Sequence, residues 1–121
     1  KTDRDYDKGL RICINNMHIV SLCAGTHNES SSALLVHLLK QQKTSTNDKR
    51  FYFSQLLGMS DHISYNLAKK GFNVAKYVPY GPIKNVLPYL IRRAEENTSI
   101  AGQMGRELIN ITAEKKRRKK N

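Results

Sequence analysis

Long apolar runs are missing from this sequence, and so are the residue patterns that build disulfide scaffolds or metal sites. It contains no apolar run of roughly 18 or more residues, the length that a transmembrane helix needs. The two cysteines, Cys13 and Cys23, are too isolated for a disulfide scaffold or a zinc site, and the four histidines lack metal-ligand spacing. The chain begins at Lys1 rather than Met and has no secretory signal. We therefore expect a processed or truncated chain without a metal.

Negative charge is scarce, and the excess of positive charge is unevenly placed. The net charge is +11, but six of the 21 Lys and Arg residues lie between Lys115 and Lys120, so only about +5 belongs to the rest of the chain. Aromatic residues are not interleaved with this run, which argues against nucleic acid as a partner. The run is interpreted first as a disordered, solvated tail, and otherwise as a localisation signal or a contact with anionic lipid.

Apolar segments typical of strands alternate with segments of helical periodicity along the chain. The first segment is interpreted as the end of a helix or a helix-to-strand connection, and it covers residues 5–17. Strands are predicted at residues 19–24, 51–57 and 74–78, and helices at residues 30–42, 61–70 and 83–97.

The helix boundaries carry their own signals. Ser60 is a predicted N-cap of the second of these helices, and Gly71 is its predicted C′ residue, where a left-handed conformation is needed. Pro88 lies within the third helix. It is tolerated in the first turn if Asn85 is the cap, and otherwise it predicts a kink.

Alternating strands and helices indicate βα units and a parallel sheet, so the expected fold class is α/β. Three strands make a small sheet, whereas a complete (β/α)₈ TIM-like barrel takes about 250 residues. The chain is therefore predicted to be roughly the final third of such a barrel, with about three βα units.

Polar clusters follow the predicted strands at the positions where ligands bind in βα proteins. The first cluster is residues 26–28, the second combines Gln55 with residues 58–59, and the third covers residues 77–81. Any one of them is more simply a loop with a helix cap. Three clusters at equivalent positions favour a binding site.

The helix from Leu87 carries a second candidate site. Its apolar stripe is opposed by Tyr89, Arg92, Arg93 and Glu96, which cluster on one side at helical spacing. Guanidinium groups pair with carboxylates bidentately, and a nearby Glu can fix an arginine rotamer, so this face suits a small carboxylate. Spacing alone leaves a solvated face with salt bridges as the simpler alternative.

Three segments closely resemble the C-terminal signature of the proline dehydrogenase family. They are residues 55–62 (QLLGMSDH), 76–82 (KYVPYGP) and 87–97 (LPYLIRRAEEN), and residues 26–29 (THNE) look like the motif that this family places after an earlier barrel strand. The resemblance covers roughly residues 22–99 in the family's order. Its block Tyr-x-x-Arg-Arg-x-x-Glu-Asn is highly specific, whereas the Thr-His-Asn triplet alone is weak.

This resemblance implies a distorted (β/α)₈ barrel, supplied here by residues 1–99, with residues 100–121 as a helical extension and disordered Lys/Arg tail. It implies FAD at the C-terminal mouth of the barrel and hydride transfer from C5 of L-proline to flavin N5, giving 1-pyrroline-5-carboxylate and passing electrons to a quinone. The implied substrate residues are Arg92 and Arg93 for the carboxylate, Tyr77 and Tyr89 as pocket walls, and Glu96 as partner of the arginines. The implied flavin contacts are Thr26, His27, Asn28 and Gln55.

The same resemblance implies a mitochondrial enzyme at the matrix face of the inner membrane. Tyr77 favours proline, because related hydroxyproline dehydrogenases tend to have a smaller residue there. The family's earlier strands supply further FAD contacts, so we expect these 121 residues alone to be inactive. The alternatives are a hydroxyproline dehydrogenase, a non-catalytic relative, and a basic module that binds nucleic acid or a membrane surface through its tail.

Overall fold

The computed structural model describes residues 2–99, 108–109, 112 and 115–116, without the side chains of residues 94 and 96–99. The chain divides into two compact units, Lys1–Val78 and Pro79–Asn121. Most of the predicted extension and basic tail, residues 100–121, lies outside the described residues. None of the helices in the described part of the chain has the length and apolar character needed to cross a membrane.

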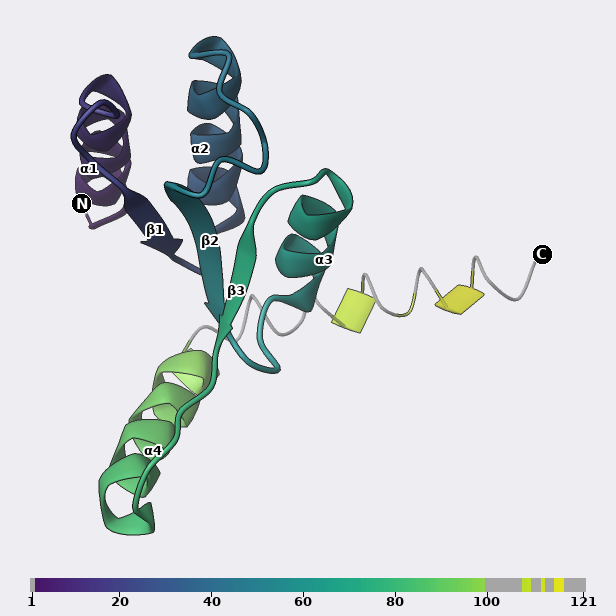
Figure 1. The fold of residues 1–121 in the computed structure, drawn as a ribbon. Coiled ribbons are helices and arrows are strands. Elements are labelled where there is room, and N and C mark those ends of the chain that lie inside the picture. Colours follow the sequence, from purple (N-terminus) through teal and green to yellow (C-terminus); the bar gives the residue numbers. More distant parts are fainter. Residues whose placement is uncertain (1, 100–107, 110–111, 113–114, 117–121) are drawn as a thin grey trace. The chain divides into compact units, whose positions relative to one another are not determined.

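Helices and strands alternate through the described residues (Figure 1). The predicted strands and helices are confirmed with small shifts at their ends, and the segment before the first strand is a full helix rather than the end of one. In order, the elements are α1 (Thr2–Asn15), β1 (Leu22–Gly25), α2 (Glu29–Gln41), β2 (Phe51–Leu56), α3 (Asp61–Lys69), β3 (Val74–Tyr77) and α4 (Ile83–Ser99).

The three strands form one parallel sheet in the order β1-β2-β3. Leu22 is paired with Phe51 across the first ladder, and Phe53 is paired with Val74 across the second. Alternate residues of β2 differ in burial, since Phe51 and Phe53 are buried while Tyr52 between them is 37% exposed. One face of the sheet is therefore covered, and the predicted α/β class with a parallel sheet is confirmed.

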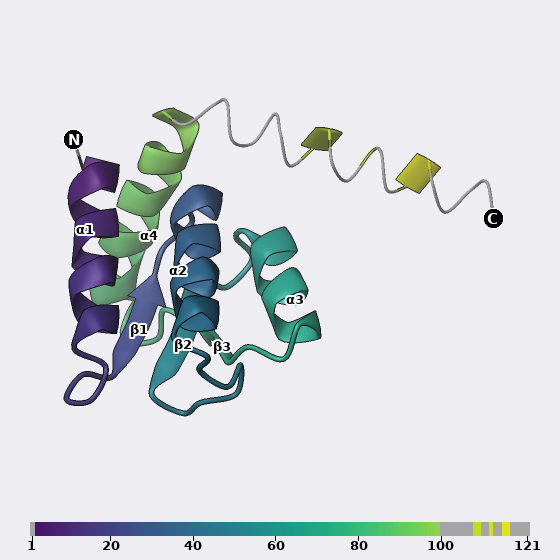
Figure 2. The ribbon, with the colours of Figure 1, turned by 90° about the horizontal axis from the view of Figure 1, so that it is seen from above.

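The covered face packs on α1, α2 and α3, which lie side by side in Figure 2 and contribute to one hydrophobic core. Leu10 and Ile14 bring α1 into this core, and Leu35 of α2 has no exposed surface. Phe53 is also fully buried, and its ring meets that of Phe72 edge to face with centroids 5.5 Å apart. Both crossover helices, α2 and α3, thus cover the same face of the sheet.

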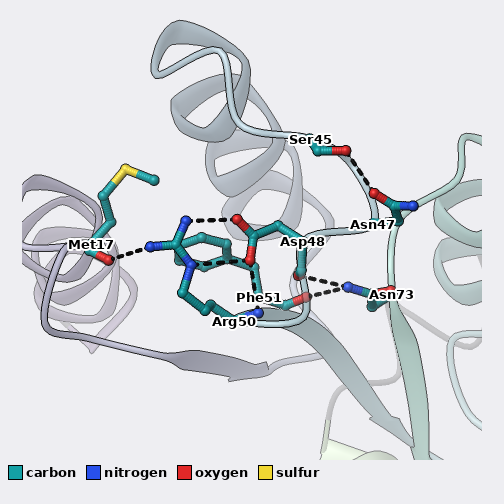
Figure 3. Close-up of polar contacts among 7 residues, drawn as sticks. All are labelled: Met17, Ser45, Asn47, Asp48, Arg50, Phe51 and Asn73. Carbon is teal, nitrogen blue, oxygen red and sulfur yellow. Dashed lines mark hydrogen bonds and ion pairs between the residues drawn. The ribbon is translucent and has the colours of Figure 1, made fainter.

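A cluster of polar contacts joins the segments that precede the three strands (Figure 3). Arg50, directly before β2, contacts the Asp48 carboxylate through Nη2 at 2.7 Å and donates from Nη1 to the Met17 carbonyl before β1 at 2.9 Å. Asn73, before β3, donates to the carbonyls of Asp48 and Phe51 at 2.8 and 3.1 Å. The hydrogen bonds from Arg50 lower the pKa of Asp48 to about 2. This end of the sheet is built for stability, and it is opposite the candidate site.

The helix α4 begins at Ile83, as predicted. The N–H groups of Asn85 and Val86 donate to the Pro82 carbonyl at 2.8 and 3.1 Å, so the first turn already contains Asn85. Of the two alternatives left open for Pro88, a cap at Asn85 is excluded, and Pro88 lies inside α4. Pro88 has no N–H to donate to the carbonyl of Lys84, which removes one hydrogen bond from the helical ladder.

Candidate functional site

The carboxyl ends of the strands bring the predicted polar loops to one edge of the sheet. The N–H of Thr26, directly after β1, donates to the Ser54 carbonyl of β2 at 3.2 Å. The N–H of Leu57, directly after β2, donates to the Tyr77 carbonyl of β3 at 3.0 Å. Backbone pairing therefore continues past each strand and fixes the start of each loop. The loops that follow β1 and β2 are held next to each other at this edge.

Thr26 and Asn28 build the turn that leads into α2. The Asn28 N–H donates to Thr26 Oγ1 at 3.0 Å, and Asn28 Oδ1 accepts from the N–H groups of Ser30 and Ser31 at 2.9 and 3.2 Å. Asn28 is thus the N-cap of α2. Its side-chain oxygen serves the helix, so this residue shapes the loop that presents Thr26 and His27.

Gln55 lies behind this loop rather than on the open face of the sheet. It is 2% exposed and shares the helix-covered face of β2 with Phe53. Its Nε2 donates to the Thr26 carbonyl at 3.3 Å, and its Oε1 accepts from Ser64 Oγ at 2.9 Å. Both ends of the amide are bound by protein groups. Gln55 therefore supports the Thr26–His27 segment from the helix-covered side of the sheet.

His27 meets a residue that the sequence pattern did not single out for the site. Its Nδ1 lies 2.9 Å from the hydroxyl of Ser60, which belongs to the neighbouring loop 33 residues later. Ser60 is the N-cap residue of α3, as predicted, but its hydroxyl makes no capping hydrogen bond. Its backbone is left-handed, with φ 52° and ψ 39°, a conformation that costs a residue with a side chain about 1–2 kcal/mol. Spacing carries no signal for this contact, because the two residues meet only when the strands pair.

Lys76 fixes the other side of the β2–α3 loop. Its Nζ donates to the Met59 carbonyl at 2.8 Å and pairs with the Asp61 carboxylate at 2.7 Å. The first turns of α2 and α3 are also linked, since His62 Nε2 lies 3.9 Å from a Glu29 carboxylate oxygen and forms an ion pair when protonated. The two loops at this edge are thus tied together by side chains from both.

Tyr77 ends β3 on the face of the sheet that the helices do not cover. It is paired with Leu56 in the β2–β3 register and is 53% exposed. This matches its predicted role as a wall of a site at the carboxyl ends of the strands, and that role stays a prediction.

A second cluster lies on α4, in the other compact unit. The guanidinium carbons of Arg92 and Arg93 lie 6.0 and 5.4 Å from the centroid of the Tyr89 ring. The structure thus brings together three of the four residues that helical spacing grouped. The fourth, Glu96, is within α4, but its side chain lies outside the described residues. Two adjacent cations repel each other and favour an anion that pairs with both.

Metal ligands form no such cluster in the described residues. No group of three or more His, Cys, Asp or Glu side chains there is placed to hold a metal ion. The side chains of the two clusters carry hydroxyl, imidazole, amide, phenol and guanidinium groups. These groups bind and orient ligands.

Comparison with known proteins assigns the family. The family model described as "Proline dehydrogenase" matches residues 1–106. The chain is 40% identical over 122 residues to "Proline dehydrogenase 1, mitochondrial" of Caenorhabditis elegans, which covers 97% of this chain and 20% of the relative. It is 46% identical over 82 residues to the Homo sapiens protein of the same name, covering 68% of this chain and 14% of that protein. The chain belongs to the proline dehydrogenase family, as its motifs predicted.

The relatives are much longer than this chain. It spans 16%, 21% and 20% of the relatives from Drosophila melanogaster, Dictyostelium discoideum and Caenorhabditis elegans. A protein of Xenopus laevis named "Hydroxyproline dehydrogenase" is also similar, with 38% identity over 115 residues, covering 95% of this chain and 25% of the relative. No solved structure matches this chain significantly.

Proposed function

We propose that this chain is the C-terminal part of an FAD-dependent proline dehydrogenase, which oxidises L-proline to 1-pyrroline-5-carboxylate and passes the electrons to a quinone. The observation that carries the proposal is the placement of Arg92 and Arg93 beside the ring of Tyr89, in a chain that belongs to this family. Proline is a carboxylate attached to a compact apolar ring. Two cations next to an aromatic ring suit both parts of that substrate.

The proposed roles on α4 follow from the chemistry of its side chains. Arg92 and Arg93 bind the substrate carboxylate through paired N–H groups, which fixes both its position and its orientation. Tyr89 and Tyr77 wall the five-membered ring. Glu96 follows the two arginines by four and three residues, and at that helical spacing it pairs with them and holds their rotamers.

We place FAD at the edge formed by the carboxyl ends of the strands, where βα proteins bind their cofactors. Thr26 and His27 contact it there, while Asn28 and Gln55 contribute by shaping the loop, because Asn28 caps α2 and Gln55 holds the Thr26 carbonyl. The hydroxyl and imidazole groups of Thr26 and His27 at this edge are groups that can hydrogen-bond to a flavin. FAD supplies the acceptor for the hydride from proline C5, and the protein positions the substrate and tunes the flavin.

The sheet fits one part of a (β/α)₈ barrel. The strand order runs without reversal, and both crossover helices cover the same face, whereas a doubly wound sheet reverses direction and covers both faces. Within the described residues, β1 and β3 each pair only with β2. Their other edges are available for the remaining strands of a longer chain. We therefore expect residues 1–121 alone to lack activity.

We propose a mitochondrial location, in the matrix and associated with the inner membrane, because the relatives from several animals are named mitochondrial. The similarity to the Xenopus laevis protein makes hydroxyproline oxidation the second candidate. Tyr77 decides between them if its ring occupies the space that a substrate hydroxyl needs. The basic run at residues 115–120 is the part we expect to meet an anionic surface.

The experiment compares proline-dependent reduction of a quinone analogue by the full-length protein and its Arg92→Ala/Arg93→Ala variant. Leaving a carboxylate without its charged partners costs roughly 3–5 kcal/mol, so KM should rise at least 100-fold while FAD stays bound. Arg11→Ala is the matched control, because Arg11 is an exposed arginine on α1. A normal KM in the double variant would show that these arginines form only a solvated face.

A further inference from the structure

A closed ring of contacts joins the two loops at the carboxyl edge of the sheet. It runs from His27 Nδ1 to the Ser60 hydroxyl at 2.9 Å, and then along the first turn of α3, where the Ser64 N–H donates to the Ser60 carbonyl at 3.2 Å. Ser64 Oγ donates to Gln55 Oε1 at 2.9 Å, and Gln55 Nε2 donates to the Thr26 carbonyl at 3.3 Å. Thr26 is bonded to His27, which closes the ring.

The hydrogen-bond directions in this ring follow from its chemistry. The Thr26 carbonyl can only accept, so the Gln55 amide nitrogen faces it and the amide oxygen faces Ser64. The hydroxyl of Ser60 is buried, and in the described part of the chain its hydrogen-bond partner is His27. The Ser60 hydroxyl can donate to His27 Nδ1, and this direction requires the neutral tautomer that carries its proton on Nε2.

The backbone at Ser60 points to a role beyond helix capping. Ser60 is left-handed, a conformation that glycine or asparagine adopts with less strain. Backbone strain that the surroundings maintain is concentrated at functional sites. In this conformation the Ser60 hydroxyl contacts His27 and makes no capping hydrogen bond with α3.

We propose that Ser60 is a positioning residue that orients His27 and selects its Nε2–H tautomer, with Gln55 and Ser64 as supports. This inference rests on the proposed function, in which His27 contacts the flavin. The described ion pairs at this edge involve Glu29 on α2, Asp61 and His62 on α3, and Lys76 on β3. None of them changes in the variants described below.

The first test uses the full-length protein stripped of flavin. The rate at which diethyl pyrocarbonate modifies His27 is followed against pH by mass spectrometry of its peptide, which gives the pKa of His27. Loss of a hydrogen bond to the neutral imidazole favours the protonated form, so Ser60→Ala should raise this pKa by about half a unit or more. Ser60→Thr keeps the hydroxyl and should preserve it. An unchanged or lowered pKa in Ser60→Ala would contradict the assigned direction of this bond.

The second test separates the hydroxyl from the backbone in the flavin-loaded protein. Ser60→Gly relieves the left-handed strain but removes the hydroxyl, so it should keep or raise the thermal stability while kcat/KM for proline falls about tenfold. Ser60→Thr should stay within about twofold of wild type, and so should Ser45→Ala, a serine at the opposite end of the sheet. In a His27→Ala background, the further loss from Ser60→Gly should disappear.

The outcomes keep the two proposals apart. If the wild-type protein holds no flavin, or if proline does not reduce its flavin, the result contradicts both the proposed function and the Ser60 inference. If the wild type is active and Ser60→Gly has the same kcat/KM, the result contradicts the Ser60 inference and leaves the proposed function standing. A Ser60→Thr variant that keeps the wild-type melting temperature and yet behaves like Ser60→Gly would also contradict the inference, because the retained hydroxyl would then have no effect.

Discussion

Truncation of Phe53 to alanine should be among the most destabilising single changes in the sheet. Phe53 has no exposed surface, and its ring packs edge to face on Phe72 with centroids 5.5 Å apart. Phe→Ala substitutions in a packed core cost about 3–5 kcal/mol, to which an aromatic pair contributes about 0.5–1.5 kcal/mol. For a domain of this kind each kcal/mol lowers Tm by roughly 2–4 °C, so the expected drop is about 6–20 °C. Phe53→Leu keeps most of the volume and should cost about 1.5 kcal/mol or less.

Thermal unfolding of the full-length protein, followed by circular dichroism at fixed concentration and flavin saturation, measures this drop. Tyr65→Ala is the control, because Tyr65 is 70% exposed on α3 and should shift Tm by no more than a few degrees. A Phe53→Ala protein that melts with the wild type would refute the assignment of Phe53 to the centre of the core.

Three further predictions concern a turn, an ion pair and the substrate. Gly71→Ala should destabilise the protein by about 1–2 kcal/mol, because Gly71 has φ +82°, whereas Gly9→Ala within α1 should stabilise it by about 0.5–1 kcal/mol; their melting temperatures test both. Hydrogen bonds from Arg50 lower the pKa of Asp48 from 3.8 to about 2. The ionised carboxylate therefore adds stability above about pH 4, and this stability is lost as the pH falls towards 2. Wild type should unfold at a higher urea concentration than Asp48→Asn above about pH 4, and the difference in urea midpoint should disappear towards pH 2. Tyr77→Ser should raise kcat/KM for hydroxyproline relative to proline, and an unchanged ratio of the two steady-state constants would exclude Tyr77 from the specificity pocket.

The alternating pattern was sufficient to predict the α/β class and the parallel sheet, because each element carries a local signal, whereas the barrel stays a prediction. Leucine spacing marked α2, and Gly71 does adopt the left-handed conformation expected after α3. The prediction of a helix at residues 83–97 is confirmed by α4 although Pro88 lies inside it, and the sequence left open only whether Asn85 caps that helix. The family model also reaches residue 1, so α1 belongs to the matched region although its sequence did not resemble the family clearly.

The candidate site was predictable where its residues share one helix, and less so where strand pairing creates the contact. Tyr89 lies one turn before the adjacent Arg92 and Arg93, so helical geometry alone places the three residues together. The contact between His27 and Ser60 depends instead on the β1–β2 register, which no local pattern encodes. Register also decides the side of the sheet on which a side chain lies, and a one-residue difference would turn it to the other face.

The most direct measurement is the visible spectrum of the purified full-length protein before and after anaerobic addition of L-proline. A flavin-dependent proline dehydrogenase should show bound oxidised flavin that is bleached by L-proline and restored by a quinone. D-proline at the same concentration should leave the spectrum unchanged. A protein that carries no flavin, or a bound flavin that stays oxidised under excess L-proline, would contradict the proposed function.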